Sequence, residues 1–415
     1  MYIVENKGGG IALILVAILC GGSFSPAMLV MERRGRLPQH IYLDYSIANF
    51  LVAVLIAVTV GQIGESKAGM PNFFTQLNQI EDNWPSVLIA MTGGLALSLG
   101  NMICQYAWAF VGLSLANIIV CCMTVVLGTT VNYFLDGRIN RAEILFPGVA
   151  CFVVAVVLGA AVHSSNTKDK EDKLSMLGGD VSTNRTNRDI EINRDITDEG
   201  MACPNSAAPR NGDDDGSSQG KPGTAEFIAQ VEKRRTIKAA GSSTFLGLAI
   251  VLFAGFCFFI FSPAFNIATN DQFHVLKKGV PHLVVYTAFF YFYMSGFLLA
   301  ICVNIWLLYR PVAGVPASTI GAYLRDWNGR HWGLLSGLLC GICNASQFMG
   351  GQAAGFATAD AVQASPLVCA FWDILLFGEY RRSSRKTYIL LACMLIMFVI
   401  AIAVLLTSAG HRKNA

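Results

Sequence analysis

The sequence predicts an all-α integral membrane protein with ten transmembrane helices. Of its 415 residues, 54% are hydrophobic and only 14% are charged, and the mean hydropathy is +0.51. Soluble domains carry roughly 25% charged residues, which excludes an ordinary cytosolic enzyme. The formal net charge of +3 leaves no basic surplus for phosphates, so no nucleic-acid partner is expected. Ten apolar runs meet the requirement of about 20 residues for a helix that crosses a bilayer.

The ten apolar runs stand in two groups of five, separated by a polar segment. The predicted spans are residues 10–31, 43–60, 87–110, 113–134, 145–163, 244–269, 284–309, 332–354, 359–377 and 388–408. The first run is longer than the apolar part of a signal peptide and ends in Met31-Glu32-Arg33-Arg34, without a small-residue cleavage site. The chain therefore divides into a first five-helix unit (1–163), a central segment (164–243) and a second five-helix unit (244–415).

The central segment differs sharply in composition from both five-helix units. It holds 14 acidic and 12 basic residues and few aromatic ones. Such a segment buries too little apolar surface to offset the entropy of ordering, so we predict a long, mostly disordered loop. Its last part, residues 224–240, combines helical apolar spacing with four basic residues, which is typical of an interfacial helix.

Arginine and lysine residues indicate the orientation in the membrane. With the N-terminus outside, the short inner loops hold ten of them and the short outer segments hold eight, and the central segment adds 12 to the inner side. Positive residues concentrate on the cytosolic side. We therefore predict that both termini lie outside and that the central loop is cytosolic.

Cysteine usage predicts neither disulfides nor a metal site. Eleven of the 12 cysteines lie inside apolar runs, where a thiol behaves as a small hydrophobic group. The pair Cys340-x-x-Cys343 has no second ligand pair nearby, so we interpret it as packing rather than as a zinc or redox site.

The two five-helix units resemble each other at a constant offset of 243 residues. Asn101 corresponds to Asn344 and Gly112 to Gly355 at this offset, and Phe-Ser-Pro-Ala at 24–27 recurs at 261–264 with an offset of 237. An odd number of spans per unit places the second copy upside down in the membrane. Inverted repeats of this kind are a transporter architecture with the substrate near the midplane, and we predict two of them here.

Several long stretches resemble one known family. Leu-Asp-Gly-Arg follows span four and Leu-Phe-Gly-Glu-Tyr-Arg-Arg follows span nine, as in the drug/metabolite transporter superfamily. A closer resemblance, to the plant ureide permeases, rests on residues 32–40, 71–77, 132–136, 138–143, 261–266, 348–355, 359–363 and 377–386. It implies proton-coupled uptake of oxo-derivatives of nitrogen heterocycles, such as allantoin, uracil and xanthine, and a place in the plasma membrane.

A nucleotide-binding stretch is sometimes attributed to the central loop of that family, and this sequence does not support one. A phosphate loop requires Gly-x4-Gly-Lys-Ser/Thr on a strand–helix turn. The nearest segment, residues 215–222, lacks the first glycine and the final hydroxyl. We therefore expect no ATP and no cofactor beyond the coupling proton.

Amide side chains in spans three and eight are candidates for binding a planar, amide-rich heterocycle. Amides offer both donors and acceptors, and aromatic faces allow stacking. The candidates are these amides, the aromatic residues beside them, and the serines that precede Pro26 and Pro263: Asn101, Gln105, Asn344, Gln347, Tyr106, Trp108, Phe348, Ser25 and Ser262. The alternative is that the amides hold helices together and that the prolines are static kinks.

Three acidic residues are candidates for carrying the coupling proton: Asp373, Asp360 and Glu379. Carboxylates inside a membrane are costly and mark functional sites. Asp373 is favoured, since it lies six residues before Glu379, about 9 Å inside by helix rise. Asp360 opens span nine as a potential first-turn cap. Arg381 and Arg382 are expected to keep Glu379 ionised.

Two other classes of function remain open. A membrane-embedded enzyme would require a catalytic motif within a span, and none of the His-Glu-x-x-His or Gly-x-Ser-x-Gly type occurs there. The second class is another transporter of the same superfamily, for purines or nucleotide sugars. A nucleotide-sugar transporter would require cationic groups in its cavity. The expected partners are a small heterocyclic substrate and the lipid bilayer, and a homodimer stays an open alternative.

Overall fold

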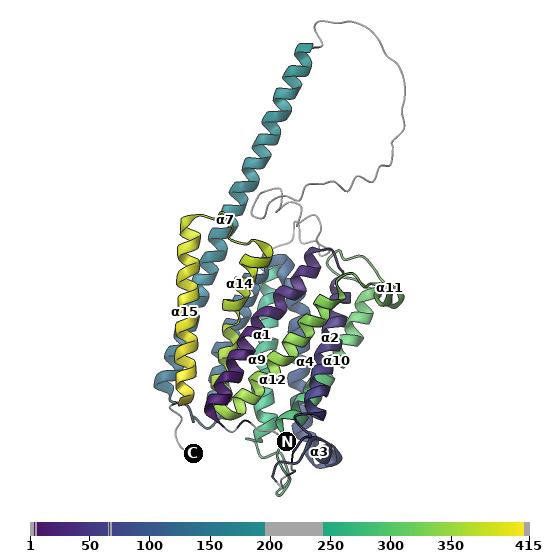
Figure 1. Ribbon diagram of the computed structural model, residues 1–415, viewed down its shortest axis with the longest axis vertical. Helices are drawn as coiled ribbons and strands as arrows, with labels where there is room; N and C mark the ends of the chain where they lie inside the picture. The colour runs from purple at the N-terminus through teal and green to yellow at the C-terminus, as the bar shows by residue number, and fades with distance from the viewer. Residues whose placement is uncertain (1–3, 5, 65, 67–68, 196–243, 411–415) are drawn as a thin grey trace.

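The computed structural model describes residues 4, 6–64, 66, 69–195 and 244–410 as a bundle of long helices (Figure 1). Nine helical segments of this part are long and apolar enough to cross a membrane. They are Lys7–Arg33 (α1), Pro38–Val58 (α2), Ile80–Val111 (α4), Leu115–Leu135, Ala142–Asp172 (in α7), Phe245–Asn270 (in α9), Val285–Tyr309 (α10), Phe356–Phe377 and Arg385–Gly410 (α15). The prediction of a helical, multi-pass membrane protein is confirmed.

The eighth predicted span corresponds to α12, Arg330–Ala354, which is not among these nine. It has 25 residues, but its glycines and amides leave it less apolar than the others. Nevertheless α12 lies inside the bundle, packed against α1 and α2 (Figure 1). The count of ten spans therefore stays a prediction that depends on this helix.

Spans four and nine are each broken in the middle. Span four consists of α5 (Leu113–Met123), a π-helical turn (Thr124–Gly128) and α6 (Thr129–Leu135). Span nine consists of α13 (Phe356–Ala359), a 3₁₀ turn (Asp360–Ala364) and α14 (Pro366–Phe377). Such irregular turns change the aim of side chains and are frequent at functional sites.

Single glycines join two pairs of helices without a loop. Gly112 connects α4 to α5 with φ 84°, and Gly355 connects α12 to α13 with φ 98°. Residues with a side chain rarely adopt positive φ, so both turns depend on glycine.

Small residues allow several helices to pack closely, as in other membrane bundles. Gly94 of α4 lies against the backbone of Phe292 in α10, and Gly337 of α12 lies against the backbone of Tyr45 in α2. The most extensive pairings are α1 with α12, α4 with α9, α7 with α15 and α4 with α10.

Helix α7 is longer than the sequence predicted. The predicted fifth span ends at residue 163, but α7 runs from Ala142 to Asp195 and projects beyond the bundle (Figure 1). The first part of the predicted central loop, 164–195, thus continues this helix. Polar side chains anchor the start of this extension, since Asp169 accepts hydrogen bonds from the Ser384 amide and the Thr387 hydroxyl, both at 2.8 Å. The predicted interfacial helix, 224–240, lies outside the described residues.

The two ends of the bundle carry different features (Figure 1). At one end, here called the termini end, α1 begins, α15 ends and the short helix α3 (Phe73–Asn78) lies. At the other, called the α7 end, are the α7 extension, α11 (Ile320–Arg325) and the α14–α15 connection. The site described below faces the termini end.

Candidate functional site

The amides predicted from the internal repeat meet in one hydrogen-bonded chain at the centre of the bundle. Asn101 donates to the Tyr45 hydroxyl at 2.9 Å, and that hydroxyl donates to the Cys340 thiol at 3.0 Å. Asn344 donates to the Tyr293 hydroxyl at 2.6 Å and also reaches Cys340 at 3.4 Å. The repeat-related asparagines therefore lie in one network, but with protein hydroxyls as partners.

The cavity beside this chain is too small for a heterocyclic substrate. It is lined by Asn101, Tyr45, Tyr293 and neighbouring residues of α2, α4 and α10, and its volume is about 20 Å³. That volume accommodates roughly one water molecule. Ligand pockets usually measure about 300–1,000 Å³. In this conformation the central amides hold helices together, which was the alternative that the sequence left open.

The other candidates of span three are also engaged with protein groups. Gln105 donates to the Pro38 carbonyl at 3.0 Å, and Tyr106 accepts from Gln39 at 3.3 Å. The Trp108 indole donates to Asn117 at 3.2 Å. These three residues thus fix the start of α2 and the α4–α5 contact.

The candidates of span eight differ from one another. Phe348 is fully buried, and its ring stacks on Phe265 with centroids 3.6 Å apart, so that face is occupied. Gln347 is 1% exposed, and neither its amide oxygen nor its nitrogen has a hydrogen-bond partner among the described residues. A buried, unpaired amide is costly and calls for a ligand or water. Among the described residues, Gln347 is thus the span-eight candidate whose amide is not engaged by protein groups.

The two serines that precede the prolines have different surroundings. Ser25 is buried in α1, beside Pro26. Ser262 in α9 belongs to a second polar group, centred on Asp360. It donates to one carboxylate oxygen of Asp360 at 2.9 Å, and Asn132 of α6 donates to the other at 2.9 Å.

Asp360 lies within span nine rather than at its start. The span begins at Phe356, so Asp360 follows the short helix α13 and is fully buried. Its carboxylate lies 3.4 Å from the position that a Cβ would take at Gly128, in the π-helical turn of span four. The two irregular turns thus lie side by side.

A chain of polar side chains leads from Asp360 toward the termini end. Asn132 also donates to Ser262 at 2.9 Å and accepts from Asn266 of α9 at 3.1 Å. Asn266 in turn donates to Asp136 at 2.9 Å. These five residues come from α6, α9 and the 3₁₀ turn, which belong to different halves of the sequence.

The polar chain ends at a cavity of about 610 Å³ at the termini end. Amide and charged side chains account for much of its lining: Lys7, Asp136, Asn270, Gln272 and Gln352. The size suits a small heterocycle, and the amides offer the donors and acceptors that such a ligand requires. No residue of this cavity was among the sequence candidates.

The other two acidic candidates lie near the α7 end. Asp373 is buried in α14 and lines an enclosed cavity of about 10 Å³ with Asn117, Cys369 and Tyr380. Glu379 forms ion pairs with Arg33, at 3.3 Å, and with Lys170. Burial would raise the pKa of Glu379, but the charges of Lys170 and Arg33 outweigh it and lower the pKa. The cations of Glu379 thus include residues of α1 and α7 that are distant in sequence.

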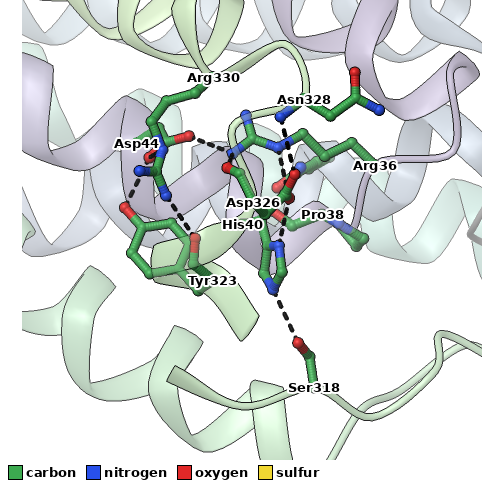
Figure 2. Close-up of polar contacts among 10 residues, drawn as sticks. Arg36, Pro38, His40, Asp44, Ser318, Tyr323, Asp326, Asn328 and Arg330 are labelled. Carbon is green, nitrogen blue, oxygen red and sulfur yellow. Dashed lines mark hydrogen bonds and ion pairs between the residues drawn. The ribbon is translucent and has the colours of Figure 1, made fainter. Parts of the chain in front are cut away.

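A larger ionic cluster closes the α7 end between α2 and α12 (Figure 2). Arg36 pairs with Asp44 at 2.6 Å and with Asp326 at 3.0 Å, and Asp326 also contacts His40 at 2.7 Å. Arg330 lies 3.2 Å from Asp44. The buried site would raise the pKa of Asp326, but hydrogen bonds from His40 and Arg36 outweigh burial and lower it.

Of the five members of the polar chain, Ser262 and Asp360 were sequence candidates, whereas Asn132, Asp136 and Asn266 were not. A local signal for them was present, because Asn132 and Asp136 are four residues apart, as are Ser262 and Asn266. Residues at this spacing share one face of a helix.

Comparison with known proteins agrees over nearly the whole chain. A family model described as ureide permease matches residues 41–408. The chain is 56% identical over 413 residues to "Ureide permease 1" of Arabidopsis thaliana, with all of both chains covered. It is 55% identical over 423 residues to "Ureide permease 2" of the same plant, again with both chains covered completely.

A relative from another plant agrees with this assignment. The "Probable ureide permease A3" of Vigna unguiculata is 52% identical over 393 residues, covering 94% of this chain and all of the relative. No solved structure matches the chain. The resemblance expected from the sequence is thus confirmed: the chain belongs to the ureide permease family.

Proposed function

We propose that this protein is a proton-coupled secondary transporter that imports ureides and related oxo-derivatives of nitrogen heterocycles, with allantoin, uracil and xanthine as substrates. The observation that carries the proposal is the amide-lined cavity of about 610 Å³ at the termini end, behind which a carboxylate is buried. The relatives are named permeases, which supports a transporter rather than an enzyme. The donor and acceptor groups of the cavity match the lactam and urea groups of these compounds.

Transport by alternating access follows from the architecture that we propose, ten spans in two inverted five-helix repeats. The packing supports it, because α1 packs on α12 as α9 packs on α4. Span one thus contacts span eight in the same way as span six contacts span three, as expected if each span of one repeat has its counterpart in the other. The glycine turns at Gly112 and Gly355 and the Asn101–Tyr45 and Asn344–Tyr293 hydrogen bonds follow the same exchange. Movement of one repeat against the other would open the site to each side in turn.

The direct test is uptake of labelled allantoin and uracil, with cross-competition by xanthine, in cells that lack their own permease. We expect saturable uptake that is stimulated by external acid and abolished by an uncoupler. Uptake that is indifferent to both would contradict proton coupling. Transport of a nucleotide sugar instead of these heterocycles would favour the other transporter class.

In the orientation that we propose, the termini end faces outward from the plasma membrane and the central loop is cytosolic. The basic residues of the inner loops support this orientation. An epitope inserted near Asp213 is expected to bind antibody only after the cells are permeabilised. Antibody binding on intact cells would reverse the proposed topology.

Gln347→Leu is expected to raise the apparent transport constant about fivefold. The amide of Gln347 has no partner to lose among the residues that the structure describes, so leucine leaves the thermal stability unchanged or higher. A lost substrate hydrogen bond of about 1 kcal/mol corresponds to roughly that factor. Concentration-dependent uptake, at equal surface expression, measures it.

Gln105→Leu is the matched control for this prediction. It removes the hydrogen bond to the Pro38 carbonyl, so it is expected to lower the thermal stability and not the affinity. An unchanged transport constant in Gln347→Leu would remove Gln347 from the substrate site.

A further inference from the structure

We propose that Asp360 is the residue that binds and releases the coupling proton, and that the proton reaches it from the cavity at the termini end along Asp136, Asn266, Asn132 and Ser262. The inference rests on the proposed function, since it presumes a coupling ion. It assigns the ion to one of the three acidic candidates, and not to the one that the sequence favoured.

The first argument is the balance of charge around each buried acid. Asp44 and Glu379 are both paired with arginine or lysine. Among the described residues, no arginine or lysine forms an ion pair with Asp360, whose partners are the neutral groups Asn132 and Ser262. A carboxylate that is buried in the membrane without a cation is costly when ionised. Whether Asp360 binds a proton therefore depends on the groups around it.

The second argument is access. Asp360 is connected by hydrogen-bonded side chains to Asp136, which lines the cavity of about 610 Å³. Asp373 faces an enclosed cavity of about 10 Å³ near the other end of span nine. Water entering along the polar chain would bring a proton to Asp360 from the side on which we place the substrate.

The third argument is what protonation changes. The ionised carboxylate accepts from Asn132 of α6 and from Ser262 of α9, and it thereby ties span four to span six. Hydrogen bonds to an ionised acceptor are roughly twice as strong as neutral ones. A proton on Asp360 would weaken both contacts at once and loosen the link that the carboxylate makes between α6 and α9. The binding of the proton is thus linked to the contact between the two halves.

The groups that face Asp360 favour it as the acid of the polar chain that binds and releases a proton. From α6 it faces Thr129 and Asn132, which are neutral, and Asp136, which is negative. From α9 it faces the neutral Ser262. Asp136 lies at the cavity, where it accepts from Asn266 and from the backbone amide of Ala357. A negative neighbour favours the protonated form of Asp360.

The test measures labelled allantoin in proteoliposomes that contain the full chain, with and without an inward proton gradient. Asp360→Asn is expected to lower gradient-driven accumulation at least tenfold and to retain exchange of allantoin at equal pH on both sides. Asp373→Asn is the matched control and is expected to keep gradient-driven accumulation. Asp360→Glu should restore part of the accumulation, with a shifted pH profile.

A second variant covers the case in which Asp360→Asn loses exchange as well. Ser262→Ala removes one hydrogen bond that stabilises the ionised carboxylate, so the pH midpoint of uptake is expected to rise by roughly half a unit to one unit. An unchanged midpoint would overturn the assignment. So would proton-driven accumulation in Asp360→Asn equal to that of the wild type.

The failure of the proposed function looks different in the same measurements. If the wild type did not move allantoin, or moved it without regard to pH, the transport proposal would fail together with the assignment. If the wild type responds to the gradient and Asp360→Asn does so equally, only the assignment fails. Loss of the gradient response in Asp373→Asn alone would assign the proton to Asp373.

Discussion

Gly94→Ala is expected to prevent the protein from reaching the cell surface in a folded state. A Cβ at this position of α4 would overlap with the carbonyl oxygen and carbon of Phe292 and with the Ser295 hydroxyl in α10. The obstructing atoms of Phe292 belong to a helix backbone and cannot turn aside as a flexible side chain can. Overpacking costs about 1–3 kcal/mol when side chains adjust, so a backbone obstruction is expected at or above the upper value.

The close approach also explains why α4 cannot simply move away from α10. The same interface carries Ser98, whose hydroxyl donates to the Gly296 carbonyl at 2.9 Å, and the buried ring of Phe292. A shift large enough for a methyl group would separate these contacts as well. The substitution is therefore expected to disrupt the whole α4–α10 interface and not only the contact at Gly94.

The measurement is the yield of monodisperse protein in detergent and its thermal midpoint, together with surface labelling. Gly337→Ala is expected to behave in the same way, since its Cβ would overlap with the Tyr45 carbonyl. Gly410→Ala is the control, because no described atom lies within 4 Å of its Cβ position. A Gly94→Ala protein with the stability of the control would contradict the close packing.

The sequence predicted the positions of the spans well, because long apolar runs report directly on the lipid environment. Its spans two and seven, 43–60 and 284–309, lie close to the observed α2 and α10. It failed at the end of span five, where hydropathy falls at Ser164 but the helix continues to Asp195. Hydropathy indicates where the membrane ends and not where the helix ends.

The sites were predicted less completely, since their partners are distant in sequence. The repeat suggested Asn101 and Asn344 as counterparts, but not that Tyr45 and Tyr293 would occupy their hydrogen bonds. Asp360 was treated as a cap, because the start of span nine was placed at 359 instead of Phe356.

The same limitation applies to charges at the α7 end. Local reading paired Glu379 with the adjacent arginines, whereas its cations include residues of α1 and α7. Helix α11 and the start of α12 cover Asp44 in the structure and leave it 1% exposed. Only the folded chain brings these opposite charges together.

Asp44→Asn is expected to lower the free energy of unfolding by about 3–5 kcal/mol, the usual cost of removing one partner of a buried ion pair. The carboxylate of Asp44 lies between two cations, Arg36 at 2.6 Å and Arg330 at 3.2 Å, and it accepts from the Tyr323 hydroxyl at 2.7 Å (Figure 2). Asparagine keeps the shape but removes the negative charge. The two guanidinium groups would then repel each other with only Asp326 left to balance them.

The thermal midpoint of the purified protein in detergent measures this effect, with Asp82→Asn as the matched control. Asp82 is exposed in the first turn of α4, where the same isosteric change is expected to cost about 0.5 kcal/mol. Adding Arg36→Met to Asp44→Asn removes one of the uncompensated charges, so the double variant should lose less stability than the sum of the two single variants. Strict additivity, or an Asp44→Asn protein as stable as Asp82→Asn, would show that the cluster does not hold α2 to α12. A double variant that is more stable than Asp44→Asn alone would identify the repulsion between the guanidinium groups as the cause. The packing lost at Arg36 would by itself lower the stability.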